Sequence, residues 1–240
     1  MNQSPILRTF VTVAVILVAA AFAGCASSGP KPSSMEEIEL LGEVQNTTLK
    51  DWAPVGGQDW AGVDALGTGL VQDARKNQKD VNALGAKLDA DGPLAVFERS
   101  VEAELADRGI SKPTAEQRQQ VQEEILKAMD ANRRETLRAS LDADRKLVAQ
   151  REKDLDTLGT MIVQITAQVN SVAGMSKGST TDQLLGGIGG GKAVQAAKDQ
   201  IAAIQRFNDV AKELLSRYKF KLGSIADAAS GAATAERQAR

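Results

Sequence analysis

Two long runs of regularly spaced apolar residues, separated by a glycine-rich stretch, constrain the fold of this 240-residue chain more than any other feature. Between 115 and 173 the chain has no proline and one glycine, Gly159, and between 193 and 227 the same spacing returns. Apolar residues three and four positions apart predict helices with one buried face, and the lack of helix breakers predicts one continuous helix over 115–173. The first half of that helix is far more polar, so we expect it to cover less core. The first stripe comprises Leu137, Leu141, Asp144, Val148, Arg151, Leu155, Leu158, Ile162, Ile165, Val169 and Val172, and the second comprises Val194, Ala197, Ile201, Ile204, Asn208, Ala211, Leu215, Tyr218, Leu222 and Ile225.

The two stripes match when the second is taken in reverse order, which predicts an antiparallel hairpin. The matching layers are Val172 with Val194, Ile165 with Ile201, Leu155 with Ala211, and Val148 with Tyr218. A shift of seven residues pairs nearly as well, so the spacing leaves the register open. We expect an all-α fold: an elongated bundle with a coiled-coil-like hairpin over 113–228, a Gly-rich loop over 174–192 and a disordered tail over 229–240.

Shorter helices are expected between 35 and 110. The apolar spacing and the turn residues predict helices over about 35–50, 59–88 and 93–108, with Gly109 placed to end the last one. The spacing of a capping box occurs at Ser34 with Glu37 and at Thr114 with Gln117. Glycines at 62, 67, 69 and 85 weaken the second helix, or permit a close approach of another helix.

Both tryptophans, Trp52 and Trp60, fall in the Pro54-containing turn between the first two of these helices. The structural interpretation is that they plug the end of a helical bundle. The functional alternatives are contact with a partner protein, since tryptophan is enriched at binding hot spots, or contact with a membrane interface.

Cys25 is the only cysteine, and it follows an uncharged, apolar run over 9–23. The run is shorter than the roughly 20 residues that span a bilayer, and Arg8 gives it a weakly positive start, which is the layout of a secretory signal peptide. Residues 22–25 (FAGC) resemble the lipobox of bacterial lipoproteins, although leucine is usual where Phe22 stands. An uncleaved membrane anchor and an ordinary signal peptide with a free thiol are the alternatives.

The lipobox resemblance, which covers residues 1–25 only, implies a lipoprotein. It implies removal of the signal peptide over 1–24, a diacylglycerol thioether on Cys25 and a further acyl chain, such as palmitate, on its amino group. Two or more acyl chains hold a protein stably on a membrane. Residues 25–34 then form a flexible tether. Ala26 lacks the aspartate associated with retention in the inner membrane, so the resemblance favours the outer membrane, facing the periplasm or the surface, in a cell that has one.

Composition excludes several kinds of chemistry. The chain has no histidine, which removes Ser-His-Asp catalysis, His-based zinc sites and the Glu-x-x-His di-iron site. After residues 1–24 are removed, 28 Lys and Arg face 31 Asp and Glu, a net charge of −3 with no basic excess for nucleic acid. We expect no catalytic residue, no metal and no cofactor.

Three further patterns are weak. Gly186 to Lys192 has P-loop spacing, but Ala193 replaces the hydroxyl residue that would hold Mg²⁺. Asp89 to Gly92 hints at a calcium loop, but Ser100 stands where a bidentate glutamate is needed. Asp144 and Arg151 interrupt the apolar seam, either to set its register or because they reach the edge of a loose bundle.

The function that the sequence favours is a lipid-anchored, non-enzymatic envelope protein that acts as scaffold, spacer or partner-binding module. The expected partners are the cell membrane, through the lipid on Cys25, and an envelope protein that contacts Trp52 and Trp60; a homo-oligomer stays open. The alternatives are an envelope hydrolase with a shallow carboxylate site and a carrier of a small apolar ligand.

Overall fold

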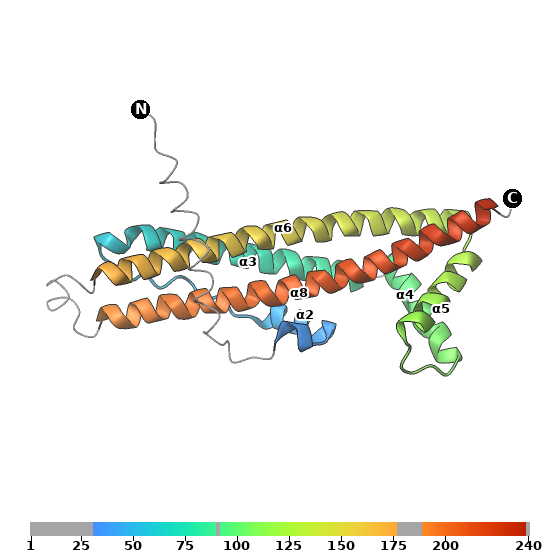
Figure 1. The fold of residues 1–240 in the computed structure, drawn as a ribbon, viewed down its shortest axis with the longest axis horizontal. Helices are drawn as coiled ribbons and strands as arrows, with labels where there is room; N and C mark the ends of the chain where they lie inside the picture. The colour runs from blue at the N-terminus through green and yellow to red at the C-terminus, as the bar shows by residue number, and fades with distance from the viewer. Residues whose placement is uncertain (1–30, 90–91, 177–188, 239–240) are drawn as a thin grey trace, which may run out of the picture. The chain divides into compact units, whose positions relative to one another are not determined.

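The computed structural model describes residues 31–89, 92–176 and 189–238, and across these ranges the chain is helical with no strand (Figure 1). The expected all-α fold is confirmed. The elements are two 3-10 turns, η1 (Pro32–Ser34) and η2 (Gln58–Trp60), and the helices α2 (Glu37–Asn46), α3 (Ala61–Asp89), α4 (Pro93–Asp107), α5 (Ala115–Ala128), α6 (Ala131–Ser176) and α8 (Gly189–Gln238).

The chain divides into two compact units. Of the described residues, unit 1 comprises those within Met1–Met35, Asn46–Lys76 and Leu155–Val210, and unit 2 comprises those within Glu36–Gln45, Asn77–Asp154 and Ala211–Arg240. The long helices α3, α6 and α8 each contribute one stretch to each unit, whereas α4 and α5 lie wholly in unit 2.

The expected antiparallel hairpin is formed by α6 and α8, and its direction is fixed by two contacts within unit 2. The guanidinium of Arg138 donates to the carbonyl of Ala229. Further along α6, Glu152 accepts from Nζ of Lys219 at 2.9 Å, earlier in α8. Because Lys219 directly follows Tyr218, and Glu152 lies one turn beyond Val148, this ion pair flanks the expected layer of Val148 and Tyr218.

Helix α3 pairs with α6 in unit 2 through charged side chains of the seam. Nζ of Lys87 lies 2.6 Å from Oδ1 of Asp144, and a guanidinium nitrogen of Arg151 lies 2.9 Å from Oδ2 of Asp80. The two seam charges are therefore bound by a neighbouring helix, which favours the register-setting interpretation over the interpretation that they reach the edge of a loose bundle.

Most of both predicted stripes is buried. Of the apolar stripe residues only Val172 and Val194 are half-buried rather than buried. The stripes omitted Phe207, Val210 and Leu214, which are also buried. In unit 2 the α8 helix contacts α3 as well as α6, since a Cβ added to Gly85 of α3 would lie 3.3 Å from the hydroxyl of Tyr218. A helix with two neighbours buries a wider face than one stripe.

The prediction of one continuous helix over 115–173 is wrong. The chain breaks after α5, where Met129 adopts extended backbone dihedrals (φ −70°, ψ 141°). Oδ1 of Asp130 then accepts from the backbone N–H of Arg133 at 2.9 Å, which caps the start of α6. Helix α5 packs on α4 instead of extending the hairpin, and Arg108, the C-cap residue of α4, pairs with Glu124 of α5. The hairpin expected over 113–228 therefore begins at 131.

The predicted ends of several elements also need correction. The capping box at Thr114 and Gln117 is confirmed, and Gly109 ends the 93–108 helix with φ +71°. The capping box at Ser34 is wrong, because Ser34 lies in η1 and the side chain of Glu39 accepts from the N–H of Glu36 instead. The tail expected over 229–240 continues α8 as far as Gln238, consistent with its alanine-rich sequence.

Candidate functional site

Cys25 and the lipobox-like segment lie outside the described residues, so lipid attachment stays a prediction. The structure describes only the end of the expected tether. There η1 covers Pro32–Ser34, and the next residue, Met35, is buried in unit 1, with a guanidinium nitrogen of Arg206 3.6 Å from its sulfur. Among the described helices, none has the length and apolarity of a membrane span.

Trp52 is buried in unit 1, with its indole ring against Gly67 and its ring nitrogen in a hydrogen bond. Its side chain is enclosed to 7% exposure, and Nε1 donates to Oδ1 of Asp64 at 3.0 Å. A Cβ added to Gly67 would lie 2.2 Å from the indole ring, so α3 needs a glycine here for the ring to pack. The expected close approach of another helix is found at Gly85, where a Cβ would meet Leu41 of α2 and Tyr218 of α8. At Gly67 the neighbour is a side chain of the turn, and at Gly62 and Gly69 a Cβ would meet nothing within 4 Å.

The carboxylate of Asp64 organises the turn that carries both tryptophans. Besides Trp52, it accepts from the backbone N–H groups of Val55 at 2.9 Å and Gly56 at 3.1 Å. Partial burial raises the pKa of Asp64, but the three hydrogen bonds together outweigh that effect and hold the pKa below its ordinary value. The hydrogen bonds bind the ionised form, so the turn is tied to a charged Asp64.

Trp60, by contrast, lies half-buried in η2. The structure therefore separates the two tryptophans: Trp52 belongs to the core of unit 1, and Trp60 keeps accessible surface. Contact with a partner protein stays a prediction. If the partner binds without rearranging the core of unit 1, the tryptophan that it can contact is Trp60.

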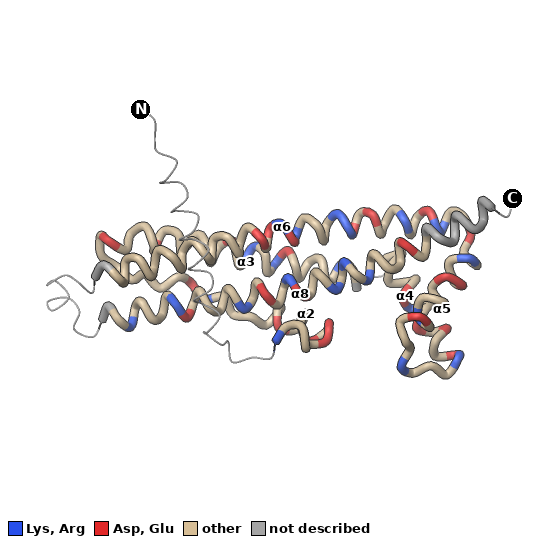
Figure 2. Tube along the Cα trace, in the orientation of Figure 1, with Lys and Arg blue, Asp and Glu red and all other residues tan. Residues whose placement is uncertain are grey.

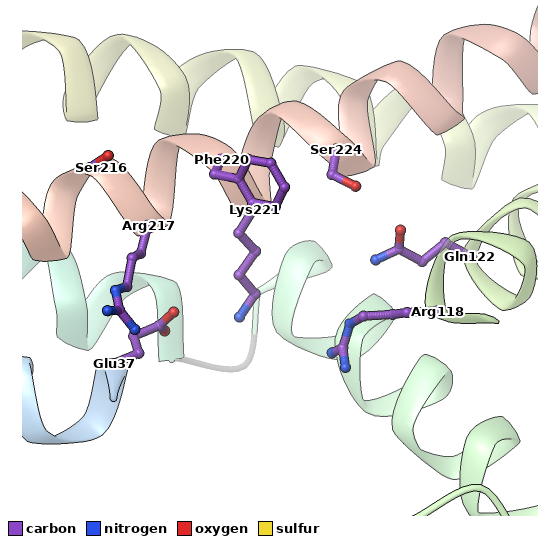
Figure 3. Close-up of a pocket in the computed structure, with 8 residues that line it drawn as sticks. All are labelled: Glu37, Arg118, Gln122, Ser216, Arg217, Phe220, Lys221 and Ser224. Atoms are coloured by element: carbon purple, nitrogen blue, oxygen red, sulfur yellow. The ribbon is translucent and has the colours of Figure 1, made fainter. Parts of the chain in front are cut away.

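Unit 2 contains a cleft of about 540 Å³ between α8 and the helices α2 and α5 (Figure 3). Its α8 wall uses a face that the buried stripe does not use. The lining residues are Glu37 from α2, Arg118 and Gln122 from α5, and Ser216, Arg217, Phe220, Lys221 and Ser224 from α8.

Ion pairs hold the charged walls of this cleft. A guanidinium nitrogen of Arg118 donates to Oε2 of Glu98 at 3.0 Å and to Glu102. Burial lowers the pKa of Arg118, but the two carboxylates outweigh it and raise the pKa above its ordinary value, so this side chain is always charged. Nζ of Lys221 lies 3.6 Å from the same Glu98 oxygen, so one carboxylate of α4 serves both cations.

Two uncharged side chains that line the cleft, Gln122 and Phe220, add an amide and an aromatic ring to its surface. Gln122 is only 4% exposed, yet it lines the cleft, and its amide points from α5 toward α8 in Figure 3. Phe220 is 79% exposed, although aromatic side chains of this size are usually covered. The cleft thus combines an aromatic surface, an amide and flanking cations, and aromatic residues and arginine are enriched at protein interfaces.

Sequence reasoning missed this cleft. Gln122 belongs to the polar part of the 115–173 run, where we expected little core. Phe220 was the available signal, because it stands between two lysines in the segment RYKFK and lies off the apolar stripe. The other walls come from segments far away in the sequence, which no local pattern brings together.

The weak motifs gain no support. Within the part of the chain that the structure describes, no group of three or more His, Cys, Asp or Glu side chains could hold a metal ion. The calcium-loop pattern from Asp89 to Gly92 falls partly outside that part, at residues 90 and 91. The P-loop-like segment falls partly outside the described residues, and from Gly189 onward it is helical. Comparison of the chain with protein-family models, with curated proteins and with solved structures finds no match.

Proposed function

We propose that this protein is a lipid-anchored component of the bacterial cell envelope that acts as a non-enzymatic scaffold or partner-binding module. The observation that carries the proposal is the position of Cys25, the only cysteine, at the end of a short apolar run and after two small residues. A thiol placed there resembles the acceptor of diacylglycerol in bacterial lipoproteins.

The surface of the described helices supports the scaffold part of the proposal. Acidic and basic residues are interspersed along α6 and α8 (Figure 2), as is typical of solvated structural helices. Many carboxylates are engaged by cations, such as Glu152 by Lys219 and Asp80 by Arg151. Carboxylates bound in this way stabilise helix contacts and are poorly placed to act as a general acid and base pair.

A labelling experiment tests the anchor. Cells that express the full chain are fed an alkyne analogue of palmitate, and the purified protein is coupled to a fluorescent azide. We expect the wild-type chain to be labelled and Cys25→Ser to be unlabelled. In the matched control, Cys25→Ser is combined with Ser28→Cys, which restores a thiol three residues away and should stay unlabelled. An unlabelled wild-type chain, or equal labelling of all three, would refute the anchor.

Delivery to the outer membrane is a separate part of the proposal, for a cell that has such a membrane. It rests on Ala26, which stands directly after Cys25. Separation of the membranes by density should place the wild-type chain in the outer-membrane fraction, and Ala26→Asp should move it to the inner membrane. The same distribution for both chains would show that residue 26 does not direct sorting here.

A further inference from the structure

We propose that the cleft beside Phe220 binds a peptide segment of a partner protein, one that carries an apolar side chain next to an acidic one. This inference rests on the proposed function, because it names the surface through which a scaffold of this kind holds its partner. Three features of the cleft carry it: an amide without a partner, an uncovered aromatic ring, and a cation with free donors.

The amide of Gln122 is the most specific of the three. The residue is 4% exposed and lines the cleft, and among the described residues its side chain has no hydrogen-bond partner. Its amide is not among the fully enclosed polar atoms, so it is open to the cleft, where an occupant can replace water as its hydrogen-bond partner. Because it offers a carbonyl acceptor and two N–H donors side by side, its natural complement is a peptide group, which offers one of each.

Phe220 supplies the apolar contact. It is 79% exposed and borders the same cleft as Gln122 (Figure 3). Covering an aromatic ring of this size with an apolar side chain removes a large area from water, and aromatic residues are enriched among the side chains that dominate binding. An occupant that satisfies Gln122 and covers Phe220 therefore needs both a backbone and an apolar side chain.

Of the cations that line the cleft, Lys221 is the one that favours an acidic side chain in the occupant. Arg118 is paired with Glu98 and Glu102, and Arg217 with Glu213, so the charges of these two arginines are already balanced. Among the described residues Lys221 forms one ion pair, with Glu98 at 3.6 Å, which is beyond hydrogen-bonding distance, so its ammonium N–H donors are available. An acidic side chain next to the apolar one can accept from this ammonium group, whereas a basic side chain offers it no acceptor.

The recessed position of Gln122 favours a peptide over a membrane surface. A bilayer presents a plane, and a plane that touches the exposed ring of Phe220 does not reach an amide that is almost fully enclosed. A cleft of about 540 Å³ lies within the size range of sites that enclose small ligands or short segments. A narrow chain can enter it and contact the ring and the amide together.

Photo-crosslinking in living cells tests the proposal on the full chain. The crosslinking amino acid p-benzoyl-phenylalanine replaces Phe220, and in a control chain it replaces Val163, another exposed apolar residue, which lies on α6 in unit 1. We expect irradiation to join position 220, but not position 163, to one protein. Mass spectrometry of the joined peptide should place the bond in a segment with adjacent apolar and acidic residues.

Three variants of the chain with the probe at 220 test the roles of the cleft residues. Gln122→Leu keeps the size of a buried side chain but removes the amide, and should lower the crosslink yield roughly three- to tenfold. Gln119→Leu makes the same change at an exposed position of α5 and should leave the yield unchanged. Lys221→Met removes the spare donors at a partly exposed position, and should lower the yield at least twofold even if Gln122→Leu fails to fold.

Several outcomes overturn the proposal. They are a crosslink to lipid only, a crosslink to a second copy of this chain, a basic target segment, no crosslink above that of position 163, or equal yields with Gln122→Leu and Gln119→Leu in folded proteins. Acyl labelling of Cys25 is measured in the same cells. A labelled chain without the crosslink contradicts the cleft alone, and a crosslinked but unlabelled chain contradicts the lipid anchor alone.

Discussion

The ammonium nitrogen of Lys87 lies 2.6 Å from Oδ1 of Asp144, and the same step of seven residues along both helices brings Asp80 to 2.9 Å from Arg151. In each pair one partner belongs to α3 and the other to α6, and the order of charges is reversed between the pairs. A slip of α3 by seven residues would place Lys87 near Arg151, so like charges would face each other. The two ion pairs therefore specify one register of α3 on α6.

The pair of Lys87 and Asp144 predicts an asymmetric response to mutation. The Asp144 side chain is 5% exposed, and after Lys87→Met the one hydrogen-bond partner left to it among the described residues is Ser140, at 3.5 Å. We expect Lys87→Met to lower the free energy of unfolding by about 1–3 kcal/mol, because a buried carboxylate loses its counter-charge. The double variant Lys87→Met with Asp144→Leu should be more stable than Lys87→Met alone.

Urea unfolding followed by circular dichroism measures this coupling in a double-mutant cycle. Lys79→Met, at an exposed position of the same helix, is the control and should change stability by less than about 0.5 kcal/mol. Equal losses at 79 and 87 would show that the ion pair contributes nothing specific.

Gly67 and Gly69 offer a matched test of the Trp52 contact. Both lie within α3, but a Cβ at Gly67 would lie 2.2 Å from the indole ring, whereas a Cβ at Gly69 would meet nothing within 4 Å. Gly67→Ala should displace Trp52 and destabilise unit 1, by about 1–3 kcal/mol. Gly69→Ala should stabilise it by up to about 1 kcal/mol, because alanine is the better helix former. Thermal melts and the emission maximum of tryptophan distinguish these outcomes, and a destabilising Gly69→Ala would contradict the account.

The hairpin, the confirmed capping box and the helix end at Gly109 could be predicted because each depends on residues a few positions apart. The break at Met129 could not, since no glycine or proline marks it. The chain turns there because α5 packs on α4, which is a tertiary cause. The one local signal is Asp130, because aspartate commonly caps the start of a helix. It was missed because its neighbours in the sequence are also polar.

The candidate cleft was beyond sequence reasoning for a different physical reason. Its walls join Glu37, Gln122 and Phe220, which lie on three helices far apart in the sequence. The burial of Gln122 depends on how α5 packs, and polar residues in a helix are otherwise expected to face water. Similarly, Trp52 lies in a turn and its hydrogen-bond partner Asp64 lies in the next helix. The proline and glycine residues predicted the turn, but they did not predict the hydrogen bond that stabilises it.

Asp64 predicts an acid-sensitive unit 1. Its pKa is lower in the folded chain than in the unfolded chain, so its hydrogen bonds stabilise the fold fully above the unfolded value of about 4 and are lost as the pH falls through the folded value. Asp64 keeps access to solvent, so we expect Asp64→Asn to cost only about 1 kcal/mol at pH 7, and less at pH 3. Asp59→Asn, an exposed change in η2, is the control. Equal losses from Asp64→Asn at pH 7 and pH 3 would show that the ionised form is not what the turn binds.

Substitutions at Ile162 and at its neighbour Val163 compare the buried seam of the hairpin with its exposed face. Ile162 is 4% exposed and the adjacent Val163 is 42% exposed. Ile162→Ala should lower the free energy of unfolding by roughly 2–4 kcal/mol, because it removes buried methyl groups and leaves a cavity. Val163→Ala, next to it on the outer face, should cost less than about 1 kcal/mol. Chemical unfolding of both variants measures the two losses in the free energy of unfolding. Similar losses would show that Ile162 does not lie in the buried seam of the hairpin.

The register of α6 on α8 is the most specific prediction. In unit 2 the expected register places Ala228 opposite Arg138. The guanidinium of Arg138 donates to the carbonyl of the next residue, Ala229, which agrees with that register. A shift of seven residues moves the partner by about 10 Å, too far for this contact. In unit 1 the same register pairs Ile165 with Ile201, both of which are buried.

Disulfide formation can determine the register in unit 1. In a chain with Cys25→Ser, so that the introduced residues are the only thiols, cysteine pairs are placed at 165 and 201, and at the alternatives 165 with 194 and 165 with 208. Because a disulfide needs Cα atoms about 4.4–6.8 Å apart, the first pair should oxidise within one chain and the alternatives should not. Preferential oxidation of either alternative would mean that the helices slip between the two units. Bonds that form only between chains would replace the intramolecular hairpin by a coiled-coil oligomer.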